Sequence, residues 1–235
     1  MRRWLLALAI LLLMASTWIG LTRGQIVPVQ RNILYVHVPN SVCALLCFVV
    51  LLVASIGVLA SGRRTWDRIA AAAAEVGFVF ATILNATGML FSRAEWNVWW
   101  TPSPRLISSA LLWFLYAVYL ILRISLPGGS HRRTRICAVF GIVAFLDVPL
   151  VYISARFIPD IHRPSFSLDS SWQTAALMLG MAGTAVLAAA LIWLRASLLA
   201  SEALLDEGRF VGEEMPHASL QPRSSVPNPS SSPAE

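Results

Sequence analysis

Long, continuous apolar stretches follow one another along most of the chain, with polar residues gathered between them. Six stretches stand out, at residues 4–22, 33–61, 69–91, 106–122, 136–154 and 175–194. Most are close to the roughly 20 residues that an α-helix needs to cross the hydrocarbon core of a bilayer. The apolar runs are continuous and lack the period of two that marks a membrane β-barrel. The pattern therefore predicts an all-α integral membrane protein with six transmembrane helices.

Composition agrees with a membrane location and excludes ordinary soluble enzymes. The chain is 57% hydrophobic and 13% charged, with a mean hydropathy of +0.68. These values lie outside the range of typical soluble domains. All 18 basic residues are arginine, so no lysine amine is available to form a Schiff base. No hydrolytic constellation, phosphate-binding loop or metal-ligand spacing is present, and no enzymatic activity is predicted.

The arginines predict the orientation of these helices. With the amino terminus inside, the cytoplasmic side would hold ten arginines, namely Arg2, Arg3, Arg63, Arg64, Arg68, Arg123, Arg132, Arg133, Arg135 and Arg195. The opposite side would hold six, namely Arg23, Arg31, Arg93, Arg105, Arg156 and Arg163. Because cytoplasmic loops carry an excess of basic residues, both the amino and the carboxyl terminus are predicted to be cytoplasmic.

The two ends of the chain need separate interpretation. Residues 1–22 have the charge and the apolar centre of a signal peptide, but the apolar run continues up to Arg23, which favours a retained helix. Residues 1–199 are predicted to form the membrane domain, with a periplasmic tryptophan-rich segment at 94–105. Residues 200–235 become rich in serine and proline, which predicts a cytoplasmic, largely disordered tail whose first residues can extend the last helix.

Three tryptophans lie between the third and fourth spans. Trp96, Trp99 and Trp100 are spaced so that a short helix would carry all three on one face. Indole rings prefer the boundary between membrane and water, so one interpretation is an aromatic belt. The other is a platform for a large flat ligand, followed by a rigid Pro-Ser-Pro and by Arg105. Residue types alone leave both open.

Further polar residues fall toward the same, outer side. His37 lies about one turn into the second span, where a metal ligand and a satisfied core histidine are alternatives. Asp147 lies in the fifth span, a turn or two from its outer end, and needs a partner or water. Pro149 predicts a kink in that helix. His162 follows in the loop between the fifth and sixth spans.

Two of the three cysteines, Cys43 and Cys47, lie within the second span. Their spacing of four residues places them on one helix face. Small apolar packing residues are the favoured interpretation, because no other soft ligand lies nearby in the sequence to complete a metal or redox site.

Three stretches, in order along the chain, resemble motifs of one family. Residues 35–39 resemble its Tyr-aliphatic-His-Val-Pro motif, and residues 96–108 its Trp-Gly-x-Trp-Trp-x-Trp-Asp-Pro-Arg-Leu-x-Ser motif. Residues 147–164 resemble its proline-containing fifth span and the Leu-His-Gln-Pro that follows. The family is haem exporter protein C of the bacterial cytochrome c maturation system, a haem-handling group with a tryptophan-rich "WWD" signature. The resemblance covers about residues 4–195.

The resemblance implies a multi-pass protein of the bacterial cytoplasmic (inner) membrane that holds haem, as bound or transported ligand, at the outer face. His37 matches the first axial ligand. Tyr152 stands where the family has its second axial histidine, and His162 is the other candidate. The cofactor-binding residues implied are His37, Trp96, Trp99, Trp100, Arg105, Tyr152 and His162, with Arg156 and Arg163 as further cations for the propionates.

The resemblance also implies the direction of transfer and the partners. Haem would pass to a periplasmic haem chaperone and on to apocytochrome c. Other expected partners are the remaining membrane subunits of cytochrome c maturation, including an ABC transporter, and membrane lipid, but no nucleic acid.

Three departures from the family pattern count against a simple transfer of the family's function. Pro102 and Ser103 replace the third motif tryptophan and the aspartate, and Tyr152 replaces the second axial histidine. Two other functions therefore stay open. One is a permease-like subunit of a transporter complex without haem of its own. The other is a membrane haem redox protein that transfers electrons through haem or the paired cysteines.

Overall fold

The computed structural model describes residues 2–27, 29–127, 130–157 and 168–214, and this part of the chain is almost entirely helical. Its elements are α1 (Arg2–Thr22), the 3-10 helix η1 (Val29–Ile33), α2 (Leu34–Ser61), α3 (Arg64–Trp96), α4 (Pro104–Ser125), α5 (His131–Ala144), α6 (Asp147–Phe157) and α7 (Ser171–Glu214). No strand occurs among the described residues, which confirms the all-α prediction.

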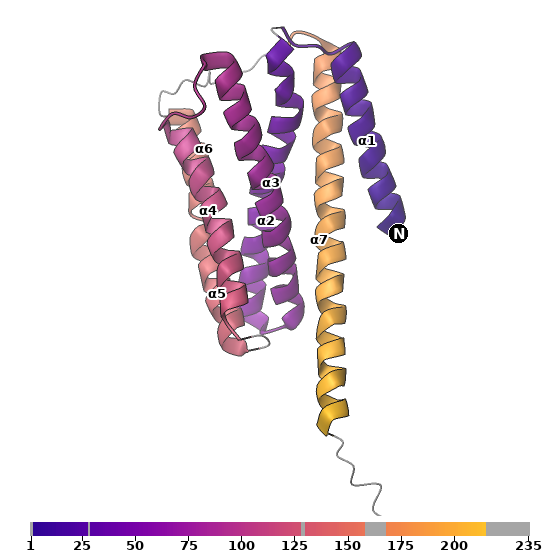
Figure 1. The fold of residues 1–235 in the computed structure, drawn as a ribbon, viewed down its shortest axis with the longest axis vertical. Helices are drawn as coiled ribbons and strands as arrows, with labels where there is room; N and C mark the ends of the chain where they lie inside the picture. Colours follow the sequence, from indigo (N-terminus) through magenta and orange to yellow (C-terminus); the bar gives the residue numbers. More distant parts are fainter. Residues whose placement is uncertain (1, 28, 128–129, 158–167, 215–235) are drawn as a thin grey trace, which may run out of the picture.

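Five helices are long and apolar enough to cross a membrane, namely α1, α2 with η1, α3, α4 and α7. They coincide with predicted spans one to four and six, and α3 and α7 extend beyond the predicted limits. The consecutive helices α5 and α6 take the place of the fifth span. Together they run along α4 from one end of the bundle to the other (Figure 1). The prediction of six membrane crossings is therefore confirmed, with the fifth divided in two.

The fifth span breaks at Phe145 and Leu146, four residues before the proline that predicted a kink. A proline ring clashes with the carbonyl of the residue four positions earlier and removes the hydrogen bond to it. For Pro149 that carbonyl belongs to Phe145, which instead accepts from the Val148 N–H at 3.0 Å. Pro149 then lies in the first turn of α6, where a missing N–H costs little. The kink is confirmed, and the clash explains its position.

The helices form a layered bundle (Figure 1). The central pair α2 and α3 packs against α7 on one side, and α1 lies against the outer flank of α7. On the other side α4 packs against α3, α5 packs against both α2 and α4, and α6 continues along α4. Residues 70–74 of α3 are five buried alanines. Small side chains of this kind let membrane helices approach closely.

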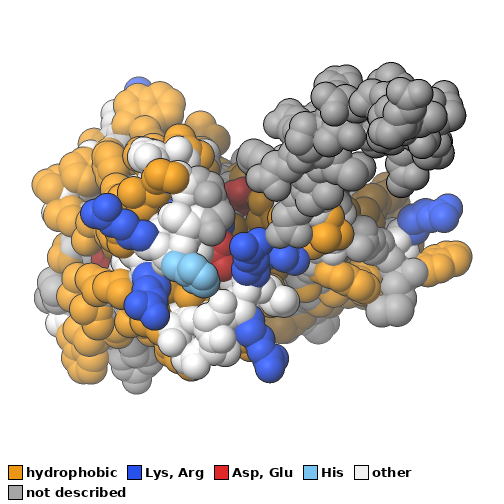
Figure 2. Space-filling model, turned by 90° about the horizontal axis from the view of Figure 1, so that it is seen from below, with side chains coloured by type: hydrophobic (Ala, Val, Ile, Leu, Met, Phe, Trp, Pro, Cys, Tyr) orange, Lys and Arg blue, Asp and Glu red, His pale blue; other side chains and the backbone are white. Residues whose placement is uncertain are grey.

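The two ends of the bundle differ in chemistry. We call the end with the α1–α2 and α3–α4 connections the tryptophan end, and the end with the α2–α3 and α4–α5 connections the arginine end. Arginine side chains gather at the arginine end, which Figure 2 shows from below. The clusters at 63–68 and 132–135 lie at its two connections. The two arginine clusters that were predicted to be cytoplasmic thus lie at the same end of the bundle.

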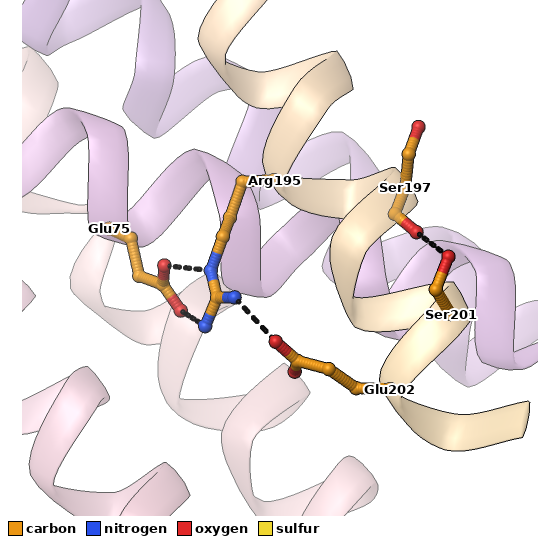
Figure 3. A network of polar contacts seen from close by, with 5 residues as sticks. All are labelled: Glu75, Arg195, Ser197, Ser201 and Glu202. Carbon is orange, nitrogen blue, oxygen red and sulfur yellow. Dashed lines mark hydrogen bonds and ion pairs between the residues drawn. The ribbon is translucent and has the colours of Figure 1, made fainter. Parts of the chain in front are cut away.

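Ion pairs tie the helices together near the arginine end. Arg123 on α4 donates to both carboxylate oxygens of Asp67 on α3, at 2.7 and 3.1 Å, and both side chains are nearly buried. Arg195 on α7 bonds Glu75 on α3 and Glu202 about two turns further along α7 (Figure 3). This second network is partly exposed and therefore stabilises less than the first. The two together join α3, α4 and α7.

The last helix continues past residue 200, as expected for the first residues of the predicted tail. α7 ends at Glu214 and reaches beyond the other helices at the arginine end (Figure 1). Residues 215–235 lie outside the described part of the chain. The disorder and cytoplasmic location of the tail stay predictions.

Candidate functional site

A cavity of about 930 Å³ opens between α2, α3 and α4 at the tryptophan end. This volume lies near the upper limit of ordinary ligand pockets, which hold about 300–1,000 Å³. The lining is mostly apolar, with aromatic rings from α3 and α4. Four residues singled out from the sequence line it together, namely His37, Trp96, Trp100 and Arg105. They come from three different elements and from the segment between α3 and α4.

His37 lies in the first turns of α2 and faces α3. Its Nδ1 is 3.0 Å from the hydroxyl oxygen of Thr87. Gly88 gives the ring room, because a Cβ at this position would lie 3.3 Å from the His37 Cε1. The imidazole is therefore held between a hydroxyl and a bare stretch of helix backbone.

Pro39 interrupts the backbone hydrogen bonds next to His37, because it has no N–H to donate. The two residues that follow bond the neighbouring carbonyls with their side chains. Asn40 Nδ2 donates to the Val36 carbonyl and Ser41 Oγ to the His37 carbonyl, both at 2.7 Å. These bonds fix the helix turn that presents the imidazole to the cavity.

The tryptophan-rich segment does not form the predicted short helix. α3 ends at Trp96 because Asn97 adopts a left-handed conformation, with φ 58° and its N–H bonded to the Arg93 carbonyl at 3.1 Å. Asparagine is one of the few residues that enter this region without a large penalty. Residues 97–103 then run without helical structure to α4. The prediction that one helix face carries all three indoles is wrong.

The three tryptophans accordingly take different positions. Trp96 lines the cavity and meets Phe91 edge to face, with ring centroids 5.4 Å apart. Trp100 also lines the cavity. Trp99 is not among the lining residues. It is 54% exposed, and the Arg93 guanidinium lies 5.8 Å from its ring centroid.

Two arginines reach the cavity, one predicted and one missed. Arg105, the second residue of α4, is the predicted one. Arg31 of η1 also lines the cavity and pairs with Glu95 at the end of α3, with Nη2 and Oε1 2.5 Å apart. In the sequence, Arg31 lies shortly before the motif at 35–39, and Glu95 lies directly before the motif at 96–108. Their contact joins segments 64 residues apart, which no local pattern indicates.

Deeper in the cavity, polar side chains of α3 and α4 bond one another. Asn85 Nδ2 donates to the Ser109 carbonyl at 3.3 Å, and Ser109 Oγ donates to Asn85 Oδ1 at 3.4 Å. Trp113 Nε1 donates to the Thr82 hydroxyl at 2.9 Å. These bonds hold together the wall that α3 and α4 form.

Some predicted site residues lie outside the described part of the chain. Tyr152 belongs to α6, but its side chain is not described, and the same holds for Arg156. His162 and Arg163 fall within residues 158–167, which are not described at all. The second ligand and these two cations therefore stay predictions.

Asp147 and the cysteines lie away from the cavity lining. Asp147 begins α6, about three helical turns before Phe157, so it lies deeper than the predicted turn or two. It is buried, and among the described residues no hydrogen-bond partner reaches its carboxylate. Cys43 and Cys47 are buried in the core cluster of α2, as expected of apolar packing residues. The described residues contain no group of three or more His, Cys, Asp or Glu able to hold a metal ion.

Comparison with known proteins assigns the chain to a family. A family model described as Heme exporter protein C matches residues 1–209. The chain belongs to the heme exporter protein C family. The resemblance noted from the three motifs is thereby confirmed. Membership makes the protein a component of cytochrome c maturation and a multi-pass protein of the bacterial inner membrane.

Individual members of the heme exporter protein C family are distant in sequence. The protein of that name from Bradyrhizobium diazoefficiens is 28% identical over 194 residues, which is 77% of this chain and 72% of the relative. The one from Rhodobacter capsulatus is 32% identical over 175 residues, or 70% of each chain. A cytochrome c biogenesis protein CcsA from Prochlorococcus marinus is 35% identical over 83 residues, 35% of this chain and 25% of the relative.

Proposed function

We propose that this protein holds haem as cargo in the cavity at the tryptophan end and passes it to a periplasmic haem chaperone during assembly of c-type cytochromes. The observation that supports this most directly is the cavity lining itself. An imidazole from one motif, and two indoles and a guanidinium from another, line one mostly apolar space of about 930 Å³.

The chemistry of this lining suits haem. A planar, apolar macrocycle gains most from aromatic rings, which Trp96 and Trp100 supply. Haem iron takes a histidine nitrogen as axial ligand, and His37 offers one. The carboxylates of the propionates prefer guanidinium partners, and Arg105 lies within the same lining. Partners consistent with the family are the other maturation subunits, including an ABC transporter, and membrane lipid.

Handover to a periplasmic partner requires the tryptophan end to face the periplasm. We therefore expect reporter fusions after Arg64 and after His131 to be cytoplasmic. Fusions near Ser103 and near His162 should be periplasmic. The physical reason is the excess of arginine at the α2–α3 and α4–α5 connections. Alkaline phosphatase and fluorescent-protein fusions at these four points measure it, and inverted signals would contradict both the orientation and the periplasmic handover.

The proposal is tested by comparing tryptophans within one short segment. The protein purified in mild detergent should carry haem, visible in its absorption spectrum. Trp96→Leu and Trp100→Leu should each weaken haem binding about 2- to 12-fold, the equivalent of the about 0.5–1.5 kcal/mol that a stacked aromatic pair adds. Haem titration of the stripped protein measures this affinity.

Trp99→Leu is the matched control, because Trp99 has the same residue type, lies next to Trp100 and is not among the cavity-lining residues. It should bind haem as the unmodified protein does. Equal losses for all three variants would show that the indoles serve only as an aromatic belt. Absence of haem from the purified protein, together with no binding on titration, would overturn the proposed function.

A further inference from the structure

The hydroxyl of Thr87 on α3 contacts both the backbone of its own helix and the ring of His37. Its hydroxyl oxygen lies 2.6 Å from the Ile83 carbonyl oxygen and 3.2 Å from the Leu84 carbonyl oxygen. The same oxygen lies 3.0 Å from Nδ1 of His37. One hydroxyl thus contacts two carbonyl groups and one ring nitrogen.

Counting hydrogens assigns the direction of each bond. A threonine hydroxyl has a single hydrogen, and a carbonyl oxygen can only accept. Two oxygens 2.6 Å apart repel unless a hydrogen lies between them, so the hydroxyl hydrogen of Thr87 points at the backbone carbonyls. The contact with His37 then requires its hydrogen from the ring, and Nδ1 must be the donor.

We propose that Thr87 is a positioning residue that fixes neutral His37 as the tautomer protonated on Nδ1 and so leaves Nε2 as the unprotonated ring nitrogen. A metal-ligating histidine generally donates its other ring N–H to an oxygen acceptor, which sets its tautomer and orientation. The assignment of the tautomer stands on the hydrogen-bond geometry alone. Its consequence for haem iron rests on the proposed function.

The neighbouring residue supports the same arrangement. A Cβ on Gly88 would lie 3.3 Å from Cε1 and 3.9 Å from Nδ1 of His37, so the bare backbone lets the ring approach the Thr87 hydroxyl. Residues 87 and 88 together therefore define both the bond and the space that orient the imidazole.

A first experiment tests the tautomer without haem. In full-length, haem-free protein labelled with ¹⁵N-histidine, NMR reports which ring nitrogen carries the proton, and His37→Ala identifies the His37 signals. We expect Nδ1 to be protonated in the unmodified protein and in Thr87→Ser, which keeps the hydroxyl. Thr87→Val removes the acceptor at nearly constant volume and should allow the Nε2-protonated form to appear.

Thr82→Val is the matched control. Thr82 also lies on α3, lines the cavity and bonds the carbonyl four residues earlier, that of Phe78, but its hydroxyl accepts from Trp113. This variant should leave the His37 tautomer unchanged. Circular dichroism checks that every variant keeps its helices. An Nε2-protonated His37 in the unmodified protein, or a tautomer unaltered by Thr87→Val, would overturn the proposal.

A second experiment follows the consequence for iron. Thr87→Val should weaken haem binding by about 10- to 100-fold, the usual effect of losing such a bond to a ligand. It should also raise the reduction potential, because a ligand that no longer donates to an oxygen is less basic and stabilises ferric iron less. Thr87→Ser, which keeps the hydroxyl acceptor, should retain both values.

The two proposals can fail separately. If haem binds through His37 while Thr87→Val retains its affinity and potential, only the role of Thr87 is refuted. If His37→Ala retains all haem, the proposed ligand is refuted, and the NMR experiment still decides the tautomer.

Discussion

Replacing His37 with alanine is expected to remove most of the haem while leaving the protein inserted and folded. His37 is the one histidine that lines the cavity among the described residues. Loss of a bond that only orients a ligand costs about 10- to 100-fold in metal affinity, so loss of the ligand itself should cost more. Absorption spectra of matched purifications and haem titration measure the loss.

The matched control is His131→Ala. His131 begins α5 at the arginine end, where its side chain is exposed. It should change neither the haem content nor the spectrum. An alanine variant of His37 that retained its haem, or equal losses for both histidines, would contradict the assignment of the ligand. Retention of the helices and of membrane insertion in both variants excludes a general folding defect.

The six crossings could be predicted because the length of an apolar stretch is read directly from the sequence and does not depend on how the helices pack. The kink at Pro149 was predictable for the same reason, since proline lacks its N–H in every context. Predicting where the helix breaks requires one further argument, namely that the ring of Pro149 clashes with the carbonyl of Phe145. The longer limits of α3 could not be predicted, because polar residues at helix ends give no apolar signal.

The tryptophan segment shows where a pattern misleads. The spacing of Trp96, Trp99 and Trp100 is helical, but the backbone conformation of Asn97, which lies between them, ends the helix. Asn97 enters the left-handed region and ends α3, so Trp99 is directed to Arg93 rather than to the cavity. Capping by asparagine was visible in the sequence and outweighs the spacing of the indoles.

Contacts between distant segments could not be predicted at all. The pairing of Arg31 with Glu95 and that of His37 with Thr87 each join α3 to elements more than 45 residues earlier in the chain. Nothing in the local pattern specifies which turn of α3 faces which turn of α2. These contacts depend on how the two helices pack, and they supply the most specific chemistry of the cavity.

One departure from the family motif has a structural explanation. Ser103 stands where the motif has aspartate, and it caps α4 by accepting from the Leu106 N–H at 3.4 Å. Serine and aspartate are both favoured at this position, because each offers a side-chain oxygen to the first free N–H groups. Pro104 follows at the first turn, where proline is also favoured. The start of α4, and with it the placement of Arg105, is therefore preserved.

The departure at Tyr152 leads to a second large expected effect. Tyr152 precedes Phe157, the last residue of α6, by five residues or about 7.5 Å, and His37 follows Leu34, the first residue of α2, by three residues or about 4.5 Å. If these two residues are the axial ligands, the iron has one neutral and one anionic ligand. Tyrosinate ligation, as in catalase, favours ferric iron, so the bound haem should be mostly oxidised and hard to reduce.

Tyr152→His should therefore give two neutral nitrogen ligands, a higher reduction potential and a low-spin spectrum in both oxidation states. Tyr152→Phe should leave His37 as the single protein ligand and give a high-spin spectrum. Redox titration and electron paramagnetic resonance of the purified variants measure these changes. His162→Ala is the comparison, because His162 is the other candidate. A spectrum altered by His162→Ala and unaltered by Tyr152→Phe would assign the second ligand to His162, since only the residue bound to iron changes the spin state when it is removed.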